Sequence, residues 1–222
     1  MPTDAATIMG VIDKAIAEAT ASGGDHVEFV LLRHGRPAEH DPATPDPSLG
    51  LLGRRQAEAA ARYLAREPVE AVYSSALARA HDTARIVGDA LRRTVRVLPD
   101  LREITVYRDD LAHEVAWRAA AARFAEQGRW DAFPLHRDER GLRARVCDAM
   151  EEIALHHATG PIVVSCHNGV INAVLADLLG LERDYFVRPA HASFTRIRHR
   201  AGRWTLHTVN ETGHLDPELV TS

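Results

Sequence analysis

Short apolar runs alternate with longer amphipathic stretches along most of the chain of 222 residues. Five stretches carry apolar residues at helical spacing, at about 51–66, 76–92, 110–127, 138–158 and 169–179. Four runs have the length and composition of strands, at 26–32, 69–74, 94–98 and 161–166. Such alternation is typical of a mostly parallel sheet with helices on both faces.

Two later β-like runs, at 192–199 and 203–209, flank Ala201 and Gly202 and alternate polar with apolar residues. They predict a hairpin that adds at least one antiparallel strand. With 45% hydrophobic residues, the chain can bury one sizeable core. We therefore expect a single α/β domain over residues 1–222, a three-layer α/β/α sandwich with a mostly parallel central sheet and an antiparallel edge strand.

Residues 1–25 are expected to form a helical extension at the N-terminus of this domain. Between Ile8 and Ala19, apolar residues recur at helical spacing with charged residues between them. The segment lacks the basic start and apolar block of a signal peptide. Such a helix could pack on its own domain, or it could serve as a lid or as the contact of a homodimer, and these alternatives stay open.

Charge and cysteine content restrict the partners and the location. The net charge of −4 gives no global reason to expect nucleic acid or an anionic membrane as a partner. No apolar stretch approaches the length of a membrane span. Two cysteines, Cys147 and Cys166, cannot build a disulfide framework, so a cytoplasmic location is expected.

Charged and polar side chains follow each of the four predicted strands. In an open parallel sheet, ligands bind outside the carboxyl ends of the strands. A lone histidine, arginine or glutamate is usually an ordinary surface or core residue, but their joint appearance at one sheet edge predicts a single site. In chain order these residues are Arg33 and His34, then Arg79 in the helix entered at Ser75, then Glu103, and finally His167 and Asn168.

These residue types suit phosphoryl transfer to or from a phosphate monoester. Arginine offers bidentate, permanently charged donors that match the oxygens of the ester. The helices entered at Ser75 and Asn168 would add backbone N–H donors. A neutral imidazole nitrogen can attack phosphorus while the other nitrogen is held by an acceptor. Gly35 would let the chain turn tightly enough for a backbone carbonyl to be that acceptor for His34.

A metal site is the competing use of the thirteen histidines. The chain has no HExxH or CxxC motif, and His156 and His157 are adjacent on a predicted helix, so they point apart. It also has no GxxxxGK[ST] phosphate-binding loop. We therefore expect neither a metal nor any other cofactor.

Five segments, in the right order, resemble motifs of the histidine phosphatase superfamily, which includes the cofactor-dependent phosphoglycerate mutases. The resemblance runs from about residue 27 to about residue 200, and it implies a phosphoglycerate mutase-like fold. An RHG signature alone would be weak evidence, whereas five ordered motifs are specific. The segments are LRHG at 32–35, GRRQA at 53–57, YSSALARA at 73–80, LREI at 101–104 and VVSCHNGVI at 163–171.

The resemblance implies a role for each residue of the predicted site. His34 would take the phosphoryl group, and Glu103 would protonate the leaving alcohol and then activate water. The phosphoryl oxygens would be held by Arg33, Arg79 and His167. The implied activity is that of a metal-independent phosphatase, a hydrolase that acts on a small phosphate ester through a phosphohistidine.

The chain departs from the family pattern in ways that bear on the reaction. Pro37 replaces the usual threonine, and Asn168 stands where a glycine is usual. The GxWEG loop of the mutases is absent after Glu103, which favours a phosphatase. A phosphoglycerate mutase-type phosphoryl transferase remains the alternative within the same chemistry, and an inactive phosphate-binding module is the alternative from another class.

Further residues are candidates for binding the substrate. Asn168 could offer its backbone N–H, although its side chain would narrow the pocket. His40 could take over a phosphate contact, or it could be a loop histidine without such a role. Arg36 and Arg102 could extend the positive pocket toward a second acidic group, or they could be charges at its rim.

The segment 104–140 stands where the family places an insertion that determines specificity. We expect a helical cap over the pocket, whose aromatic residues mostly pack the cap onto the core. A minority of these residues would touch the substrate. The aromatic residues are Trp117, Phe124, Trp130 and Phe133.

Overall fold

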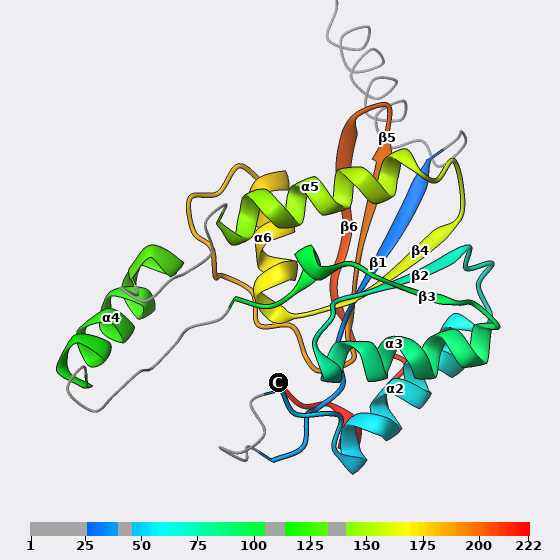
Figure 1. Cartoon of the computed structure of the whole chain (residues 1–222), viewed down its shortest axis with the longest axis horizontal. Coiled ribbons are helices and arrows are strands. Elements are labelled where there is room, and N and C mark those ends of the chain that lie inside the picture. Colours follow the sequence, from blue (N-terminus) through cyan, green and yellow to red (C-terminus); the bar gives the residue numbers. More distant parts are fainter. Residues whose placement is uncertain (1–25, 40–45, 105–113, 133–140) are drawn as a thin grey trace, which may run out of the picture.

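A six-stranded sheet forms the centre of the protein, as a computed structural model describes it for residues 26–39, 46–104, 114–132 and 141–222 (Figure 1). The strand order is β3-β2-β4-β1-β5-β6. β1 to β4 are parallel, while β5 runs antiparallel to β1 and β6 antiparallel to β5. The mostly parallel sheet with an antiparallel edge is therefore confirmed. The strands are β1 Val27–Arg33, β2 Ala71–Ser74, β3 Val95–Val97, β4 Pro161–Cys166, β5 Phe194–Arg200 and β6 Arg203–Glu211.

Helices cover both faces of the sheet, which confirms the three predicted layers. Figure 1 shows α5 and α6 on one side of the sheet and α2 and α3 on the other. The α-helices are α2 Leu51–Leu64, α3 Ala78–Leu91, α4 Glu114–Gln127, α5 Leu142–Leu155 and α6 Asn168–Leu178. Three 3₁₀ turns are η1 Pro99–Leu101, η3 Trp130–Ala132 and η4 Pro217–Leu219. The predicted N-terminal helix lies outside the described residues.

Two helices begin later than their apolar periodicity predicts. α5 begins at Leu142 rather than near residue 138, because Gly141 precedes it with a φ of 74°, a left-handed backbone conformation that no helix continues through. α3 begins at Ala78 rather than at residue 76, after Leu77 in an extended conformation. Periodicity reports the buried face of a helix and not the point at which its backbone turns.

The apolar run at the start of the chain is a fully buried central strand. Phe29 and Leu31 pack into the core under α5 and α6, and Val30 and Leu32 pack into the core under α2 and α3. All four side chains have no exposed surface. A strand buried on both faces reads as a continuous apolar run because neither face meets water. β1 is therefore a rigid support for the residues that follow it.

The direction of β5 brings an additional segment to the edge where the parallel strands end. Leu32 of β1 pairs with Phe194, the first residue of β5. The backbone N–H of Arg33 donates to the carbonyl oxygen of Ser193 at 3.2 Å. The residues that precede β5, rather than those that follow it, therefore lie beside the carboxyl end of β1.

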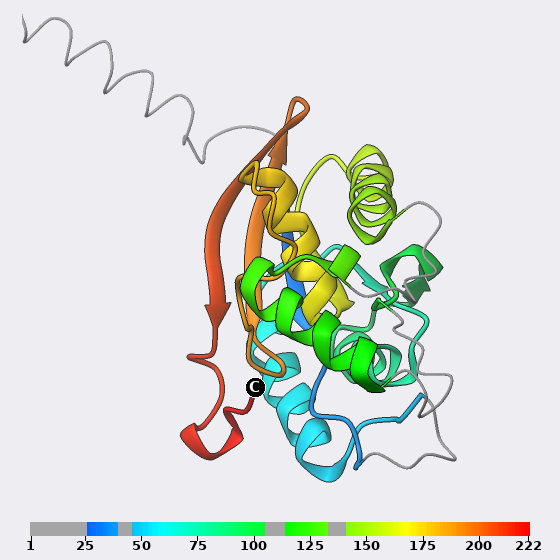
Figure 2. The same cartoon turned by 90° about the vertical axis from the view of Figure 1, so that its left-hand side faces the viewer.

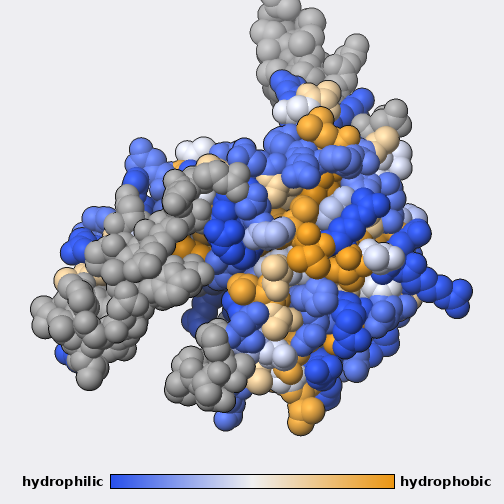
Figure 3. All heavy atoms as spheres, in the orientation of Figure 1, coloured by the Kyte–Doolittle hydropathy of each residue, from blue (hydrophilic) through white to orange (hydrophobic). Residues whose placement is uncertain are grey.

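The periphery of the molecule carries α4 and a largely polar surface. In Figure 1 α4 lies on the outer left, and Figure 2, in which that side faces the viewer, shows it in front of the sheet. Hydrophilic residues cover much of the face in Figure 3, with a narrower band of hydrophobic residues between them. Among the residues that the structure describes, every helix is too short or too polar to traverse a lipid bilayer.

Candidate active site

His34 stands at the end of β1 with its two ring nitrogens in different roles. Nδ1 lies 2.8 Å from the carbonyl oxygen of Gly35, which can only accept, so Nδ1 carries the proton. Nε2 is therefore unprotonated, and it accepts a hydrogen bond from Nε of Arg79 at 3.3 Å. Burial lowers the pKa of His34 well below its ordinary value, and the nearby arginines add to the effect. The backbone acceptor predicted from the sequence is present. It holds the proton on Nδ1 and leaves the neutral ring with an unprotonated Nε2.

The turn after His34 depends on two glycines packed back to back. A Cβ on Gly35 would overlap the carbonyl oxygen of Gly53 in α2, and a Cβ on Gly53 would overlap the carbonyl oxygen of Arg36. The N–H of Gly35 donates to Oγ1 of Thr83 at 3.0 Å. The turn is thus held between α2 and α3, and this fixes the direction of the His34 ring.

Arg79 comes from the first turn of α3 and is oriented by a residue that sequence reasoning missed. Asp46 accepts a hydrogen bond from the N–H of Ala78 at 2.8 Å and pairs with Nη1 of Arg79 at 3.4 Å. It caps α3 from a loop more than thirty positions earlier, where no local capping pattern could reveal it. Its carboxylate holds the guanidinium beside His34.

His167 follows β4 and immediately precedes α6. Its ring centroid lies 5.1 Å from that of His34, and its Nε2 lies 2.8 Å from Oγ of Ser75. Nδ1 is buried and has no hydrogen-bond partner among the described residues. Burial lowers the pKa of His167 well below its ordinary value. The second imidazole predicted for this edge is thus neutral and keeps one polar atom open to a ligand.

Glu103 follows η1, and its carboxylate rests on the first turn of α6. Its oxygens accept from the backbone N–H groups of Gly169 at 3.1 Å and Ile104 at 3.0 Å. A Cβ on Gly169 would overlap Oε1 of Glu103, so the approach requires glycine at that position. Burial raises the pKa of Glu103, and this outweighs the opposing effect of the N–H donors and of Arg79 and Arg33. A carboxyl group that keeps its proton to higher pH is suited to act as an acid.

A buried arginine fixes the backbone that carries Glu103. Arg145 of α5 has 1% of its surface exposed. Its Nη1 donates to the carbonyl oxygens of Asp100 at 2.6 Å and Arg102 at 2.8 Å. The first carbonyl lies within η1 and the second directly follows it, so Arg145 sets the path of the chain into Glu103.

Arg33 reaches across to the segment that precedes β5. Its Nη1 donates to the carbonyl oxygen of Pro189, and its Nη2 lies 3.1 Å from Nε2 of His191. The Nε of Arg33 is buried and has no partner among the described residues. The ring centroid of His191 lies 5.6 Å from that of His34. His191 precedes a strand, and because β5 runs antiparallel to β1, the rule that ligands bind after strand ends does not predict it.

Four further residues are predicted from the sequence to bind the substrate, and the structure describes three of them. The side chain of Asn168 is engaged with other residues: its Nδ2 donates to Oη of Tyr185 at 2.7 Å, and its Oδ1 accepts from Nδ2 of Asn172 at 2.8 Å. Arg36 is exposed, yet it lies close enough to His191 to help lower the pKa of that ring. Arg102 is exposed and pairs with Asp100 at 3.9 Å, at the rim. His40 lies outside the described residues.

Aromatic residues join the α4 and η3 segments to the core. The rings of Phe124 and Trp130 stack with centroids 4.5 Å apart, and Tyr185 lies 5.5 Å from Phe124. The N–H of Trp130 donates to Asp184 at 3.1 Å. Phe124 and Trp130 therefore pack against each other and beside Tyr185. Phe133 and the side chain of Trp117 lie outside the described residues, so the cap as a whole stays a prediction.

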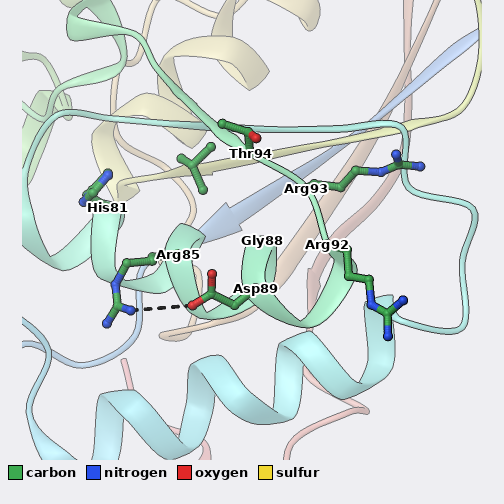
Figure 4. Close-up of a pocket in the computed structure, with 8 residues that line it drawn as sticks. His81, Arg85, Gly88, Asp89, Arg92, Arg93 and Thr94 are labelled. Atoms are coloured by element: carbon green, nitrogen blue, oxygen red, sulfur yellow. Dashed lines mark ion pairs between the residues drawn. The ribbon is translucent and has the colours of Figure 1, made fainter.

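A hollow of about 440 Å³ on the far part of α3 and the turn into β3 is a separate feature (Figure 4). Arg85 pairs there with Asp89 at 3.5 Å, and Nε of Arg93 donates to the carbonyl oxygen of Val69 at 3.0 Å. None of the residues placed around His34 lines this hollow. Arg85, Asp89 and Arg93 are thus engaged within the protein.

Positively charged side chains and neutral imidazole rings surround His34 at the end of β1. Two guanidinium groups, those of Arg33 and Arg79, and two further imidazoles, those of His167 and His191, lie near its ring. Among the described residues, no group of three or more His, Cys, Asp or Glu side chains is arranged to hold a metal ion. A family model of the histidine phosphatase superfamily (branch 1) matches residues 29–212. The chain belongs to the histidine phosphatase superfamily.

Proteins similar to this chain match between 84% and 86% of its length. A protein of Yersinia pestis named a probable phosphoglycerate mutase is 27% identical, over 86% of this chain and 95% of its own length. The structure of a mycobacterial glucosyl-3-phosphoglycerate phosphatase is 27% identical, with a TM-score of 0.72 over 84% of this chain and all of that one. A phosphoglycerate mutase of Bacillus anthracis shares the fold at 20% identity, with a TM-score of 0.70 over 86% of this chain and 95% of that chain.

Proposed function

We propose that the protein is a metal-independent phosphatase that hydrolyses a phosphate monoester through a phosphohistidine at His34. The observation that carries the proposal is the pair of contacts on the His34 ring: Nδ1 lies 2.8 Å from the carbonyl oxygen of Gly35, and Nε2 lies 3.3 Å from Nε of Arg79. Together they assign the proton to Nδ1 and leave Nε2 unprotonated. A nucleophile must present a free lone pair, and here the backbone of Gly35 secures it. Membership of the superfamily supports an enzyme of this kind.

The first step transfers the phosphoryl group to the enzyme. Nε2 of His34 attacks phosphorus, so that a P–N bond forms as the bond to the alcohol oxygen breaks. Glu103 gives its proton to that oxygen, and its raised pKa suits it to the role. Arg33, Arg79 and His167 hold the three phosphoryl oxygens, whose charge must be stabilised in the transition state.

The second step returns the enzyme to its starting state. Glu103, now ionised, takes a proton from water as the water oxygen attacks phosphorus. The P–N bond breaks, inorganic phosphate leaves, and Nε2 of His34 regains its lone pair. Glu103 ends protonated, so atoms and charge balance over the cycle.

The residues near His34 suggest which substrate the protein would bind and which groups would contact it. The proposed substrate is a small phosphate ester, and neither nucleic acid nor a membrane is proposed as a partner. Asn168 would contribute its backbone N–H at the start of α6, because its side chain is engaged with Tyr185. Arg36 and His40 are proposed as outer contacts. Since two relatives are named for phosphoglycerate-type compounds, such esters belong in the first substrate panel.

The direct test is release of phosphate from p-nitrophenyl phosphate in excess EDTA. The wild type is expected to turn over and His34→Ala to be inactive, with Arg85→Ala as a matched control on an exposed cation paired with Asp89. An inert wild type, or a fully active His34→Ala variant, would contradict the proposal.

The two alternatives predict different outcomes in assays of phosphoryl transfer and of phosphate binding. A mutase would move phosphate to a second hydroxyl group without net hydrolysis. An inactive binding module would bind phosphate tightly and hydrolyse no ester.

A cytoplasmic location is proposed from the absence of disulfides, since both Cys147 and Cys166 are free, and cell fractionation tests it.

A further inference from the structure

His191 occupies the corner between Arg33 and the end of the chain. It precedes β5, and 8% of its surface is exposed. Its Nε2 lies 3.1 Å from Nη2 of Arg33, and its Nδ1 lies 3.1 Å from Oγ1 of Thr221. Its backbone N–H also donates to the carbonyl oxygen of Thr221 at 2.7 Å. The ring is therefore anchored on one side and meets a residue of the proposed site on the other.

The chemistry of the two partners assigns the proton on the ring. A guanidinium group has only donors, so Nε2 of His191 must accept from Arg33 and carries no proton. The proton of the neutral ring is then on Nδ1, which donates to Thr221. The hydroxyl of Thr221 also accepts from Nε2 of Gln56 at 2.9 Å. Arg33 thus assigns the tautomer, and the hydroxyl of Thr221 can accept the Nδ1 proton that results.

Gln56 extends this set of hydrogen bonds to the loop after His34. Oε1 of Gln56 accepts from the backbone N–H of Arg36 at 2.7 Å, and Nε2 of Gln56 donates to the carbonyl oxygen of Leu219 at 2.6 Å. Gln56 therefore ties the loop beyond His34 to the segment that holds His191. This chain of contacts makes the orientation of Arg33 depend on residues near position 221.

We propose that His191 is a positioning residue, which holds Arg33 in its phosphate-binding orientation through Nε2 while Thr221 keeps the proton on Nδ1. The inference rests on the proposed function, because it assigns Arg33 to a phosphate oxygen. A neutral acceptor orients the guanidinium without cancelling its charge. A carboxylate in that place would compete with the phosphate for the same cation, which Asp46 does in part at Arg79.

The surroundings of His191 oppose its protonation. Arg33, Arg36 and Arg188 lie near the ring, as does the neutral ring of His34. Burial and these cations lower the pKa of His191 to about 4. A second ring proton would also place an N–H against the N–H of Arg33. The accepting tautomer is therefore maintained at neutral pH.

The test combines ring ¹⁵N NMR with matched substitutions. In wild-type protein at pH 7, His191 is expected to show a protonated Nδ1 and an unprotonated Nε2, the resonances being assigned by their loss in His191→Gln. His191→Leu removes the acceptor, and binding of inorganic phosphate is expected to weaken about tenfold, as is kcat/KM. His191→Gln keeps an acceptor at the end of the side chain and is expected to stay within about threefold of wild type.

Thr221 provides a second pair of variants that leaves His191 in place. Thr221→Ser keeps the hydroxyl and is expected to behave as wild type, whereas Thr221→Val is expected to shift His191 away from the Nδ1–H tautomer and to weaken phosphate binding. If His191→Leu does not fold, this pair and the wild-type spectrum still decide the matter.

Several results would overturn the inference. These are a wild-type His191 protonated on Nε2, equal phosphate affinity in His191→Leu and His191→Gln, or wild-type affinity in Thr221→Val with an altered tautomer. A wild type that binds phosphate with this pattern but hydrolyses no ester would defeat the proposed function alone. A wild type that binds no phosphate would defeat both.

Discussion

Arg79 donates a hydrogen bond from Nε to Nε2 of His34 at 3.3 Å, so the guanidinium covers the lone pair proposed to attack phosphorus. Without a ligand, the contact satisfies a buried acceptor and favours the tautomer with the proton on Nδ1. In the proposed mechanism a phosphoryl oxygen takes over the donor, which frees Nε2 as the substrate arrives. Asp46 limits how far Arg79 can move, because it pairs with Nη1 of the same group.

Replacing Arg79 with alanine is expected to lower kcat/KM by about 10²–10³-fold, the usual cost of losing one donor to the transition state. Arg79→Lys keeps a charge but not the fork, and it is expected to recover only part of the loss. Steady-state kinetics with Arg85→Ala as a control on the same helix checks this. Equal activity of the Arg79 and Arg85 variants would contradict the role of Arg79.

Replacing Glu103 with glutamine should matter most for esters whose alcohol is a poor leaving group. Hydrolysis of an alkyl phosphate is expected to fall by about 10²–10⁴-fold, since the alcohol oxygen then receives no proton. The effect on the phosphorylation step with p-nitrophenyl phosphate should be much smaller, because nitrophenolate leaves without a proton. Pre-steady-state bursts with the two substrates separate these cases. A loss that is the same for both would argue against proton donation by Glu103.

The pH dependence of kcat/KM should be bell-shaped. Activity is expected to fall at low pH as His34 becomes protonated, and at high pH as Glu103 loses its proton. Because the pKa of His34 is lowered and that of Glu103 is raised, the optimum should extend to the acidic side of neutrality. In Glu103→Gln the high-pH limb should disappear. A flat wild-type profile between about pH 4 and 9, with chemistry limiting, would contradict both assignments.

Gly169→Ala should separate activity from stability. The new Cβ would overlap Oε1 of Glu103, so the carboxyl group must move, while alanine suits a helix better than glycine by roughly 1 kcal/mol. Activity on alkyl phosphates is therefore expected to fall at least tenfold, with the melting temperature unchanged or raised. Gly213→Ala is the control, since no atom lies within 4 Å of its added Cβ. Full activity in Gly169→Ala would show that the position of Glu103 is not restricted.

Stability should decrease as the pH falls below about 6.5, the ordinary pKa of histidine. The folded pKa values of His34, His167 and His191 are all lowered by burial, so the unfolded chain binds more protons in this range. Glu103 acts in the opposite direction, because its raised pKa adds stability that is lost as the pH rises. Urea midpoints from pH 7.5 to 4.5 test the net effect, and His191→Gln should flatten the curve. A His191→Gln variant whose stability falls with pH as steeply as that of the wild type would contradict the neutral, buried state of that ring.

The sequence predicted the residues that lie at the ends of parallel strands. Arg33 ends β1, His34 and His167 directly follow β1 and β4, and Glu103 follows the η1 turn after β3. The parallel direction of β1 to β4 brings these residues to one edge. This inference needs only the position of each apolar run, because buried parallel strands are rigid and all end at the same edge of the sheet. The hydrogen bond from His34 to the carbonyl of Gly35 was predictable for the same reason, since both atoms belong to one turn.

Asp46 and His191 could not be found by the same reasoning. Asp46 caps a helix that begins more than thirty positions later, and His191 precedes a strand whose direction is reversed. Both contacts depend on which segments become neighbours in space, which local periodicity does not report. When a hairpin pairs antiparallel with a central parallel strand, the residues before its first strand lie at the edge where the parallel strands end. Those residues are therefore also candidates for the site. Ser193 to Phe194 mark that point here.

The central claim, phosphoryl transfer to Nε2 of His34, is tested most directly by trapping the phosphoenzyme. Enzyme mixed with a ³²P-labelled ester and quenched in alkali should carry label that is stable to base, labile to acid and located on His34 by peptide mass spectrometry. Glu103→Gln should accumulate more of it, because water attack is slowed. Label that persists in His34→Ala, or turnover of the wild type with no labelled histidine at any quench time, would contradict the account.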